Sequence, residues 1–580
     1  ASPSPRSPSC RTPQVPSAIP CRGLRKKNIS TPRKNCSFSS ANPEYLYFGG
    51  VIGQLYSDAD GIVNTEKGVI TLEESTYASY VLGGGCIGTA PASNAKATAQ
   101  VNFFIKNVTN YGAINSYASH SVKYGFYIGG CFGYLYEETI NGTLTSPDVD
   151  NVHNYGPVTI KGDDHYTVKI GGIASYIGGL STNLHNHETG TINIDVTTRG
   201  TIQVGGVSQA LKDTVSDITN DGDITINGSA VGTIYVGGCI KDPHNYKRTR
   251  CVNNGDITIN AKTDTGCFVG GITYDSGAKH YFTECHNTGN IIYGKDASTA
   301  KYLAIGGLVG KIEATSAATY NVFTRCSNSG DIILKGNVAT AGYACAGGCY
   351  GFIYGGATIV VDGGFTNSGD IIFEGEMTTT YTGTDTHKTR NSLDMGGFAG
   401  WVVPTIQWTS KTYPTWTGNV VNTGSIKHLG KSSTNVHIGG IFGYLENTAP
   451  PISDGKFINT GDITFTGSYK ADAAPHGVGG LAGVALKGFE NGQAYCTIEA
   501  PAHPAAGMAI GSSRTSENIA KNCEVGGTIM VEYNEEEDVA IETKISASNF
   551  HKYLYGGTTN WSGVENYDGC SHLASKPTIQ

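Results

Sequence analysis

Histidine and carboxylate side chains stand close together at two places in the chain where they could do chemistry. His185-x-His187 sets two imidazoles one residue apart, a spacing that can chelate a metal ion. No third ligand stands beside this pair in the sequence, so we interpret it as a solvated loop and expect no metal site. The cluster Asp163-Asp164-His165 could serve acid–base catalysis or bind calcium. No matching cluster recurs at the same phase of the chain, and we interpret it as a solvated turn.

Longer catalytic signatures are missing from the sequence. It contains no His-Glu-x-x-His, which argues against a zinc peptidase, and no Gly-x-Ser-x-Gly nucleophile elbow. Gly-Gly-x-x-Gly strings resemble phosphate-binding loops, but they recur along the chain without a helix after them. We therefore expect no catalytic residue, no cofactor and no enzymatic activity.

Two short motifs alternate along the chain, and the elements they define must position any functional side chain. The first is Asn-x-Gly followed by a polar and an aliphatic residue. The second is Gly-Gly preceded by an apolar residue, and it follows the first after 17 to 20 residues in eight of nine cases and after 29 in the ninth. Composition alone does not produce such a phase lock, so the motifs mark a structural repeat. We expect the asparagines to stack into a structural ladder made of Asn110, Asn154, Asn220, Asn253, Asn287, Asn328, Asn367, Asn422 and Asn459.

Alternation within each period has the two-residue repeat of a β-strand. The residue two before each Asn is apolar or a cysteine, and the residue four after it is Ile or Val, so both should point inward. The most regular periods, from Asn220 to Asn253 to Asn287, are 33 and 34 residues long. The pattern predicts an all-β parallel β-helix, or β-solenoid, of about 12 coils with roughly 33–45 residues and three strands in each.

The chain has 15 cysteines, and the repeat explains where several of them stand. Cys251, Cys285 and Cys326 stand two residues before the Asn in consecutive coils, where Cys can act as a small apolar side chain. Stacking at about 4.8 Å would also bring neighbours such as Cys251 and Cys285 within disulfide range. We favour buried free thiols, and a disulfide between neighbours stays open.

The glycine-rich segments carry a family resemblance. Ile305-Gly306-Gly307-Leu308-Val309-Gly310 and Val478-Gly479-Gly480-Leu481-Ala482-Gly483 resemble the GLUG motif, and Asn459-Thr460-Gly461-Asp462-Ile463 is similar to its companion element. The resemblance covers about residues 45–485. It is to GLUG-motif β-solenoid repeat proteins of the surface and secreted type of Bacteroidota, which implies export and a cell-surface setting without implying an activity.

The chain divides into three predicted parts. Residues 1–44 form a Pro-rich basic N-terminal arm, residues 45–483 form the solenoid repeats, and residues 484–580 form degenerate final coils and a C-terminal cap. The first 40 residues hold seven Pro and eight Lys or Arg with no acid, which is typical of a disordered tail, with a docking arm as the alternative.

Charge and hydropathy narrow the choice of partners. A net charge of −8 over 580 residues, without a basic block in the body of the chain, gives no indication of a nucleic-acid partner. No run of 18 apolar residues is present, so we expect no membrane span. Trp401, Trp408 and Trp416 cluster near a Thr-rich insertion at 376–391 and are candidate glycan contacts.

We interpret the chain as an extracellular or cell-surface protein with a structural or adhesive role, and as a candidate self-assembling filament subunit. Open sheet edges expected at both ends of a solenoid would invite pairing between copies. The alternatives are a β-helical polysaccharide lyase or hydrolase and a carbohydrate-binding surface protein.

Overall fold

The computed structural model describes residues 45–579 with gaps. The residues left out between these limits are 73–78, 91–102, 118–124, 137, 141–142, 244–246, 276–278, 315–319, 341, 356–357, 380–391, 404–415, 447–451, 453, 470–475, 502–504, 514–519, 535–538 and 557–567. The predicted N-terminal arm and most of the Thr-rich insertion lie outside the described residues, as does Trp408.

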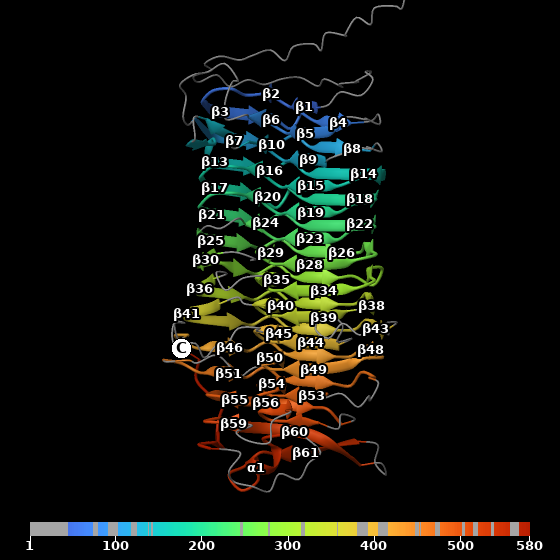
Figure 1. Ribbon diagram of the computed structural model, residues 1–580, viewed down its shortest axis with the longest axis vertical. Coiled ribbons are helices and arrows are strands. Elements are labelled where there is room, and N and C mark those ends of the chain that lie inside the picture. The colour runs from blue at the N-terminus through green and yellow to red at the C-terminus, as the bar shows by residue number, and fades with distance from the viewer. Residues whose placement is uncertain are drawn as a thin grey trace, which may run out of the picture.

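The described residues form an elongated rod of stacked β-strands. Figure 1 shows strands lying across the long axis in successive rungs, with the chain advancing from one end of the rod to the other. Nearly all strand pairs are parallel, and each strand pairs with its counterparts in the coils before and after it. The prediction of an all-β parallel β-solenoid is confirmed.

Every coil from β3 (Ala59–Asn64) to β54 (Ala482–Ala485) contains at least four strands. One runs through β21 (Val215–Asn220), β22 (Ile224–Ala230), β23 (Ile234–Gly237) and β24 (Ile240–Pro243). The prediction of three strands per coil is wrong because the chain bends at Gly-Gly. The bend divides the glycine-rich segment into two strands that belong to different sheets.

The strands that enter the Gly-Gly bend form one sheet of 13 parallel strands. Besides β23 it contains β1 (Tyr45–Gly49), β5 (Tyr80–Gly84), β9 (Gly125–Gly129), β15 (Val168–Gly171), β19 (Ile202–Gly205), β28 (Gly266–Gly270), β34 (Tyr302–Gly306), β39 (Tyr343–Gly347), β44 (Ser392–Gly396), β49 (Asn435–Gly439), β53 (Gly477–Gly479) and β57 (Ala506–Gly507).

The strands that leave the bend form a sheet of six and then a sheet of seven. The first contains β24 with β2 (Ile52–Gln54), β6 (Ile87–Ala90), β10 (Phe132–Leu135), β16 (Ala174–Ile177) and β20 (Ser208–Leu211). The second contains β29 (Thr273–Asp275), β35 (Val309–Ala314), β40 (Tyr350–Gly355), β45 (Ala399–Val403), β50 (Phe442–Leu445), β54 (Ala482–Ala485) and β58 (Ile510–Ser512).

The strands on either side of the Asn-x-Gly turn join into one large sheet with the strands that close the rod. Before the turn lie β21 and β3 (Ala59–Asn64), β7 (Phe104–Asn110), β13 (Asp148–Asn154), β17 (Ser181–Asn186), β25 (Lys247–Asn253), β30 (Lys279–Thr283), β31 (His286–Asn287), β36 (Tyr320–Asn328), β41 (Thr358–Asn367), β46 (Val420–Asn422) and β51 (Phe457–Asn459). After it lie β22 and β4 (Ile70–Leu72), β8 (Ile114–Ser116), β14 (Val158–His165), β18 (Ile192–Thr198), β26 (Ile257–Ile259), β27 (Lys262–Thr263), β32 (Ile291–Tyr293), β33 (Ser298–Thr299), β37 (Ile332–Leu334), β38 (Asn337–Thr340), β42 (Ile371–Phe373), β43 (Glu376–Thr379), β47 (Ile426–His428), β48 (Lys431–Ser432) and β52 (Ile463–Phe465).

The core fills the centre of the rod with columns of equivalent side chains. The residues two before and four after each ladder Asn are buried, as the alternation predicts, with Ile218 and Ile224 both at 0% exposure. A coil cannot bury this face by itself, so each one depends on its neighbours for its core.

A second apolar cluster lies outside this core, in the seam between the sheet that enters the Gly-Gly bend and the seven-stranded sheet that leaves it. Tyr343 of β39 packs on Phe352 of β40 and on Trp401 of β45, with ring centroids 4.4 Å and 5.3 Å apart. A Cβ on Gly351 would come within 2.6 Å of the backbone nitrogen of Ile305, so the two sheets approach closely here. Strands at the seam are therefore buried on both faces, as β39 and β45 are.

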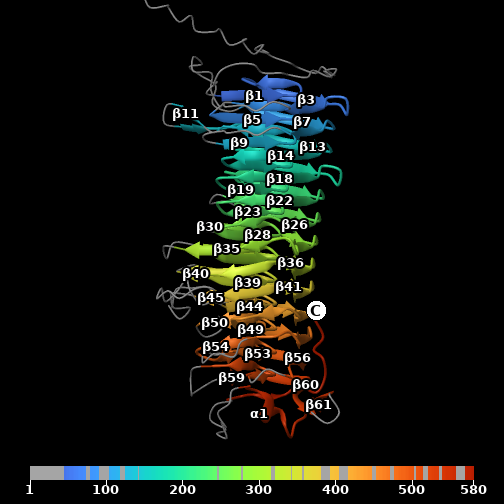
Figure 2. The same ribbon diagram turned by 90° about the vertical axis from the view of Figure 1, so that its right-hand side faces the viewer.

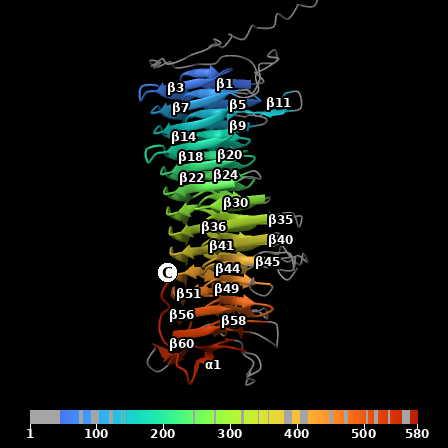
Figure 3. The ribbon, with the colours of Figure 1, turned by 90° about the vertical axis from the view of Figure 1, so that its left-hand side faces the viewer.

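The two ends of the rod differ. At the C-terminal end β60 (Glu524–Asn534) pairs antiparallel with β61 (Val539–Lys544), beside the short helix α1 (Phe550–Tyr553). The last strands are β55 (Phe489–Glu490), β56 (Gly492–Glu499), β59 (Ala520–Lys521) and β62 (Ser571–His572). After β62 the chain returns along the flank, and the C mark lies beside β46 and β51 in Figures 1 and 3.

The outermost described strands at the N-terminal end of the rod are edge strands. Among the described residues, β1 pairs on one side, with β5, and β3 pairs on one side, with β7. Among the described residues, the expectation of open edges therefore holds for β1 and β3 at this end, and at the other end β61 is also an edge strand, since it pairs only with β60. The antiparallel pair β11 (Glu138–Ile140) and β12 (Thr143–Thr145) projects from the flank, as Figure 2 shows. None of the described helices has the length and apolar character needed to cross a membrane.

Candidate functional site

The asparagine ladder runs along one corner of the rod. Each ladder Asn ends the strand before a glycine-containing turn, and each is buried. From Asn64 to Asn422, every Nδ2 donates to the Oδ1 of the Asn in the next coil at 2.7–2.8 Å. The same Nδ2 also donates to the glycine carbonyl of its own turn, as Asn253 does to Gly255 at 2.9 Å. The buried amides are thus paired along the whole series.

The ladder contains all nine asparagines predicted from the motif and two more, Asn64 and Asn186. Both were missed because their turns place the glycine four residues after the Asn, at Gly68 and Gly190, instead of two. Asn186 nevertheless pairs in register with Asn154 and Asn220. A search that allowed longer turns would have found both.

The second glycine of each Gly-Gly pair lies against this ladder. A Cβ on Gly271 would come within 2.1 Å of the Gly307 carbonyl and 2.4 Å of Asn287 Cγ, and Gly130 meets Gly172 and Asn154 in the same way. Glycine is required here for close approach. The contact joins the Gly-Gly bend of one coil to the ladder Asn of the next coil.

Two outward positions flank each ladder Asn, one just before it and one just after it, and across coils they form two polar columns. His153 and His185 occupy the position before the Asn in adjacent coils and pair in register. Tyr155, His187 and Asp221 occupy the position after it, where each backbone N–H donates to the ladder Asn carbonyl of the preceding coil at 2.8–2.9 Å.

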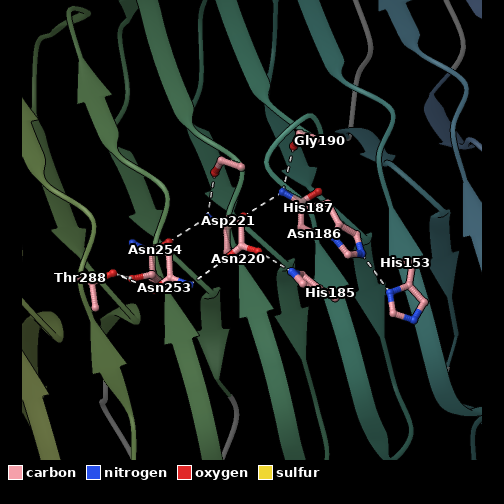
Figure 4. A network of polar contacts seen from close by, with 11 residues as sticks. His153, His185, Asn186, His187, Gly190, Asn220, Asp221, Asn253, Asn254 and Thr288 are labelled. Carbon is pink, nitrogen blue, oxygen red and sulfur yellow. Dashed lines mark hydrogen bonds and ion pairs between the residues drawn. The ribbon is translucent and has the colours of Figure 1, made fainter.

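These columns bring three imidazoles together as a histidine cluster of His153, His185 and His187. One ring nitrogen from each lies within 4.8 Å of the others. His153 Nδ1 and His187 Nε2 are 3.0 Å apart, and Figure 4 shows the two rings meeting across neighbouring turns. The rings of His185 and His187 stack with centroids 3.6 Å apart, and Tyr155 stacks on the His187 ring at 3.8 Å.

Burial and repulsion between the rings favour the neutral forms of His187 and His153. All three rings are half-buried. Desolvation, followed by repulsion from His185 and His153, lowers the pKa of His187 to about 4, and desolvation with repulsion from His185 lowers the pKa of His153. Asp221 Oδ2 lies 2.5 Å from His185 Nε2 and supplies a carboxylate at the edge of the cluster. Neutral imidazoles with available lone pairs are ligands for divalent transition metals.

The prediction of a solvated loop at His185-x-His187 is therefore wrong for His185, whereas His187 lies half-buried in the turn between β17 and β18. His185 belongs to β17, and the third ligand that the local sequence lacked is supplied by His153 from the coil before it. Aligning the sequence on Asn154 and Asn186 would have placed all three histidines together.

The other residues singled out from the sequence are placed differently. Trp401 and Trp416 are 1% and 2% exposed, so neither offers a ring face to a glycan, and the prediction for these two is wrong. Asp163 and His165 belong to β14, not to a turn, and His165 is buried. The 12 described cysteines are unpaired, and all except Cys570 are buried, in agreement with the favoured free thiols.

A buried polar group in the seam was not foreseen from the sequence. Asp394 Oδ1 lies 2.5 Å from His437 Nδ1, and Asp394 Oδ2 accepts a hydrogen bond from Ser392 at 2.7 Å. Cys345 occupies the same column one coil earlier, and burial raises its thiol pKa well above the ordinary value. With Asp394 and His437 only 1% and 3% exposed, the group has no access for a substrate and serves as a buried hydrogen-bonded contact between neighbouring coils.

Comparison of the chain with protein-family models, with curated proteins and with solved structures found no match. The fold and the site define a parallel β-solenoid that carries a polar corner with a cluster of three histidines.

Proposed function

We propose that this protein is a non-catalytic β-solenoid of the cell exterior with a structural and adhesive role, of the kind that its GLUG-like segments imply. The observation that carries the proposal is that its most regular polar residues are engaged in stacking coil on coil. The ladder amides pair from Asn64 to Asn459, and the glycines that meet them leave no space for a ligand. Such a rod supplies length and rigidity.

The hydrogen bonds of three aspartates support the part of the proposal that assigns no enzymatic activity. Asp223, Asp256 and Asp331 each accept a backbone N–H from the next coil, at 2.8–2.9 Å. They serve as turn acceptors that hold the backbone of the next coil. The test is a polysaccharide panel assayed for new reducing ends and unsaturated products. Turnover on any glycan would establish the lyase or hydrolase alternative in its place.

Self-association into filaments is the second part of the proposal, and it is supported by the edge strand β1, which pairs on one side only among the described residues. Edge strands present unpaired backbone groups that template pairing with another chain. Electron microscopy across a concentration series should show end-to-end assemblies of the wild-type protein. Tyr45→Lys adds a charge on edge strand β1 and should disperse them. Tyr281→Lys, at an equally exposed position in the middle of the rod, should not. Monodisperse single rods at every concentration would rule out the filament.

A carbohydrate-binding surface is a second candidate function, favoured by a group of tyrosines on the outer side of the first coils. Tyr45 stacks on Tyr80 with centroids 4.9 Å apart, and Tyr134 contacts both Tyr127 and Tyr176. Aromatic faces with polar hydroxyl ends suit sugar rings. A glycan array should give binding that Tyr127→Ala removes and Tyr281→Ala retains; a blank array would leave the structural role alone.

A further inference from the structure

We propose that the histidine cluster of His153, His185 and His187 binds one divalent transition-metal ion of the zinc or copper class and so links neighbouring coils of the rod. The inference concerns a side-chain site on the flank and does not depend on how rods assemble. The three ligand atoms lie within 4.8 Å of one another before any ion is present.

A hydrogen-bonded chain fixes which nitrogen of His153 carries the lone pair. The Asp60 carboxylate can only accept, so Asn107 donates to it through Nδ2 at 2.6 Å. Asn107 Oδ1 then accepts from Asn151 Nδ2, also at 2.6 Å. Asn151 Oδ1 is left to accept from His153 Nε2–H at 2.9 Å. His153 Nδ1 is therefore unprotonated, and it points at His187.

The contact between His153 and His187 is the place where the ion would sit. In the metal-free protein, His187 Nε2–H donates to the lone pair of His153 Nδ1 across 3.0 Å. Two nitrogens at this separation can both lie about 2.1 Å from one zinc ion. On binding, the ion takes the place of the proton between them. That proton leaves Nε2 for solvent, and His187 Nδ1 takes one up, so the ring stays neutral.

The side chains around the three rings already orient them through hydrogen bonds and stacking, as the partners of metal-binding histidines do. Asp221 accepts from His185 Nε2, which leaves Nδ1 as the lone-pair nitrogen of that ring, and Asn254 Nδ2 holds Asp221 Oδ1 at 2.7 Å. Tyr155 stacks on His187, and Tyr111 stacks on Tyr155 with centroids 4.8 Å apart. Figure 4 shows the connection from the cluster through Asp221 to Asn254 and Thr288.

The donor set selects the metal. Three imidazoles favour Zn²⁺, Cu²⁺ or Ni²⁺, whereas Ca²⁺ and Mg²⁺ prefer oxygen ligands. Asp221 adds a negative charge close to the ion. The half-buried rings leave one side open, so a water molecule can complete the coordination.

Calorimetry and Cu²⁺ electron paramagnetic resonance on the full chain without an affinity tag test the proposal. We expect one Zn²⁺ per chain, a Tm raised by a few degrees, and nitrogen hyperfine coupling from three imidazoles. His187→Gln and His153→Gln should each weaken Zn²⁺ at least 100-fold and leave two coupled nitrogens. Asp221→Asn should weaken it about 10–100-fold. Circular dichroism checks that each variant is folded.

His286→Gln is the matched control, because His286 occupies the same column without a second histidine and pairs with Ser327. It should bind Zn²⁺ as the wild type does. Stoichiometric binding that His187→Gln and His153→Gln leave unchanged, an equal loss in His286→Gln, or no binding by the wild type would overturn the proposal.

Discussion

His428 is a polar residue whose pKa is lowered by burial in the core of the rod. It ends β47 fully buried, with its ring stacked between Phe373 and Phe465 of the adjacent coils at 5.2 Å and 4.6 Å. Burial lowers the pKa of the imidazole from 6.5 to about 4. The folded protein therefore holds this ring neutral at pH values where the unfolded chain would protonate it.

This shift makes stability depend on pH with a definite sign. A depressed histidine pKa means that the unfolded state binds more protons between pH 6.5 and 4, so stability is complete above pH 6.5 and falls on acidification through that window. The full loss is about 3 kcal/mol. His428→Phe, which extends the neighbouring phenylalanine column, should remove this part of the acid sensitivity. Urea unfolding of both proteins at pH 7 and pH 4 measures the difference, and parallel losses would contradict the assignment.

At the residue scale, the sequence predicted which positions are buried and which asparagines stack, but it did not predict which outward side chains of neighbouring coils meet. The Asn position and the buried positions around it followed from the two-residue period, because each depends on the local strand. The histidine cluster did not, because His153 and His187 are 34 residues apart and meet only when their coils stack in register. The contact depends on Asn186 belonging to the ladder, and its unusual turn concealed that.

At the element scale, the contact between Gly-Gly and the Asn ladder packs each coil against the next. The glycines of these pairs have ordinary negative φ values, since none is among the glycines with positive φ in the described chain. Their role is steric. The backbone of one coil passes against both the ladder amide and the glycine carbonyl of the next coil.

Gly271→Ala should therefore destabilise the rod sharply. The added Cβ would fall 2.1 Å from the Gly307 carbonyl, which must move, at a cost of about 3 kcal/mol or more. Gly53→Ala is the matched control, because a Cβ at Gly53 meets no atom within 4 Å and alanine suits a strand better than glycine. Thermal unfolding should show a lower Tm for the first variant and an unchanged or higher one for the second. Equal effects would refute the steric explanation.

The packing at the seam between the two glycine-rich sheets could not be predicted from the sequence. Alternation predicts one buried face per strand, yet β39 is buried on both faces because Phe352 and Trp401 cover its outer side. The sharp bend that creates this second packed layer depends on glycines meeting backbone from another coil. Such contacts leave no period in the sequence, so neither the fourth strand nor the burial of Trp401 could be anticipated.

At the scale of the whole molecule, the effects of substitutions in separate coils on the free energy of unfolding should be additive. Each coil contacts only its neighbours, so distant changes act independently and adjacent ones interact. Asn110→Ala and Asn328→Ala should each cost about 2 kcal/mol by leaving a neighbouring amide unpaired, and should add in combination. The double variant Asn287→Ala with Asn328→Ala should lose about 1 kcal/mol less stability than the sum of the two single variants. Each single change leaves the other amide without its partner, whereas the double change removes both amides.

Chemical denaturation of the single and double variants measures these terms. Exposed Asn337→Ala, in the same coil as Asn328, should stay within about 0.5 kcal/mol of the wild type. Additivity in both pairs would mean that the ladder hydrogen bonds do not couple neighbouring coils.

The asparagine ladder also gives the rod an electrical direction. In the parallel sheets the backbone groups point alternately up and down the axis, so their dipoles largely cancel. The side-chain amides do not alternate, because every Nδ2 from Asn64 to Asn422 donates toward the C-terminal end. The ladder is therefore a line of aligned dipoles, each polarising the next, with its negative pole at Asn64 and its positive pole at Asn459. Rods joined head to tail would continue this line, whereas rods meeting through two N-terminal edges would bring like poles together.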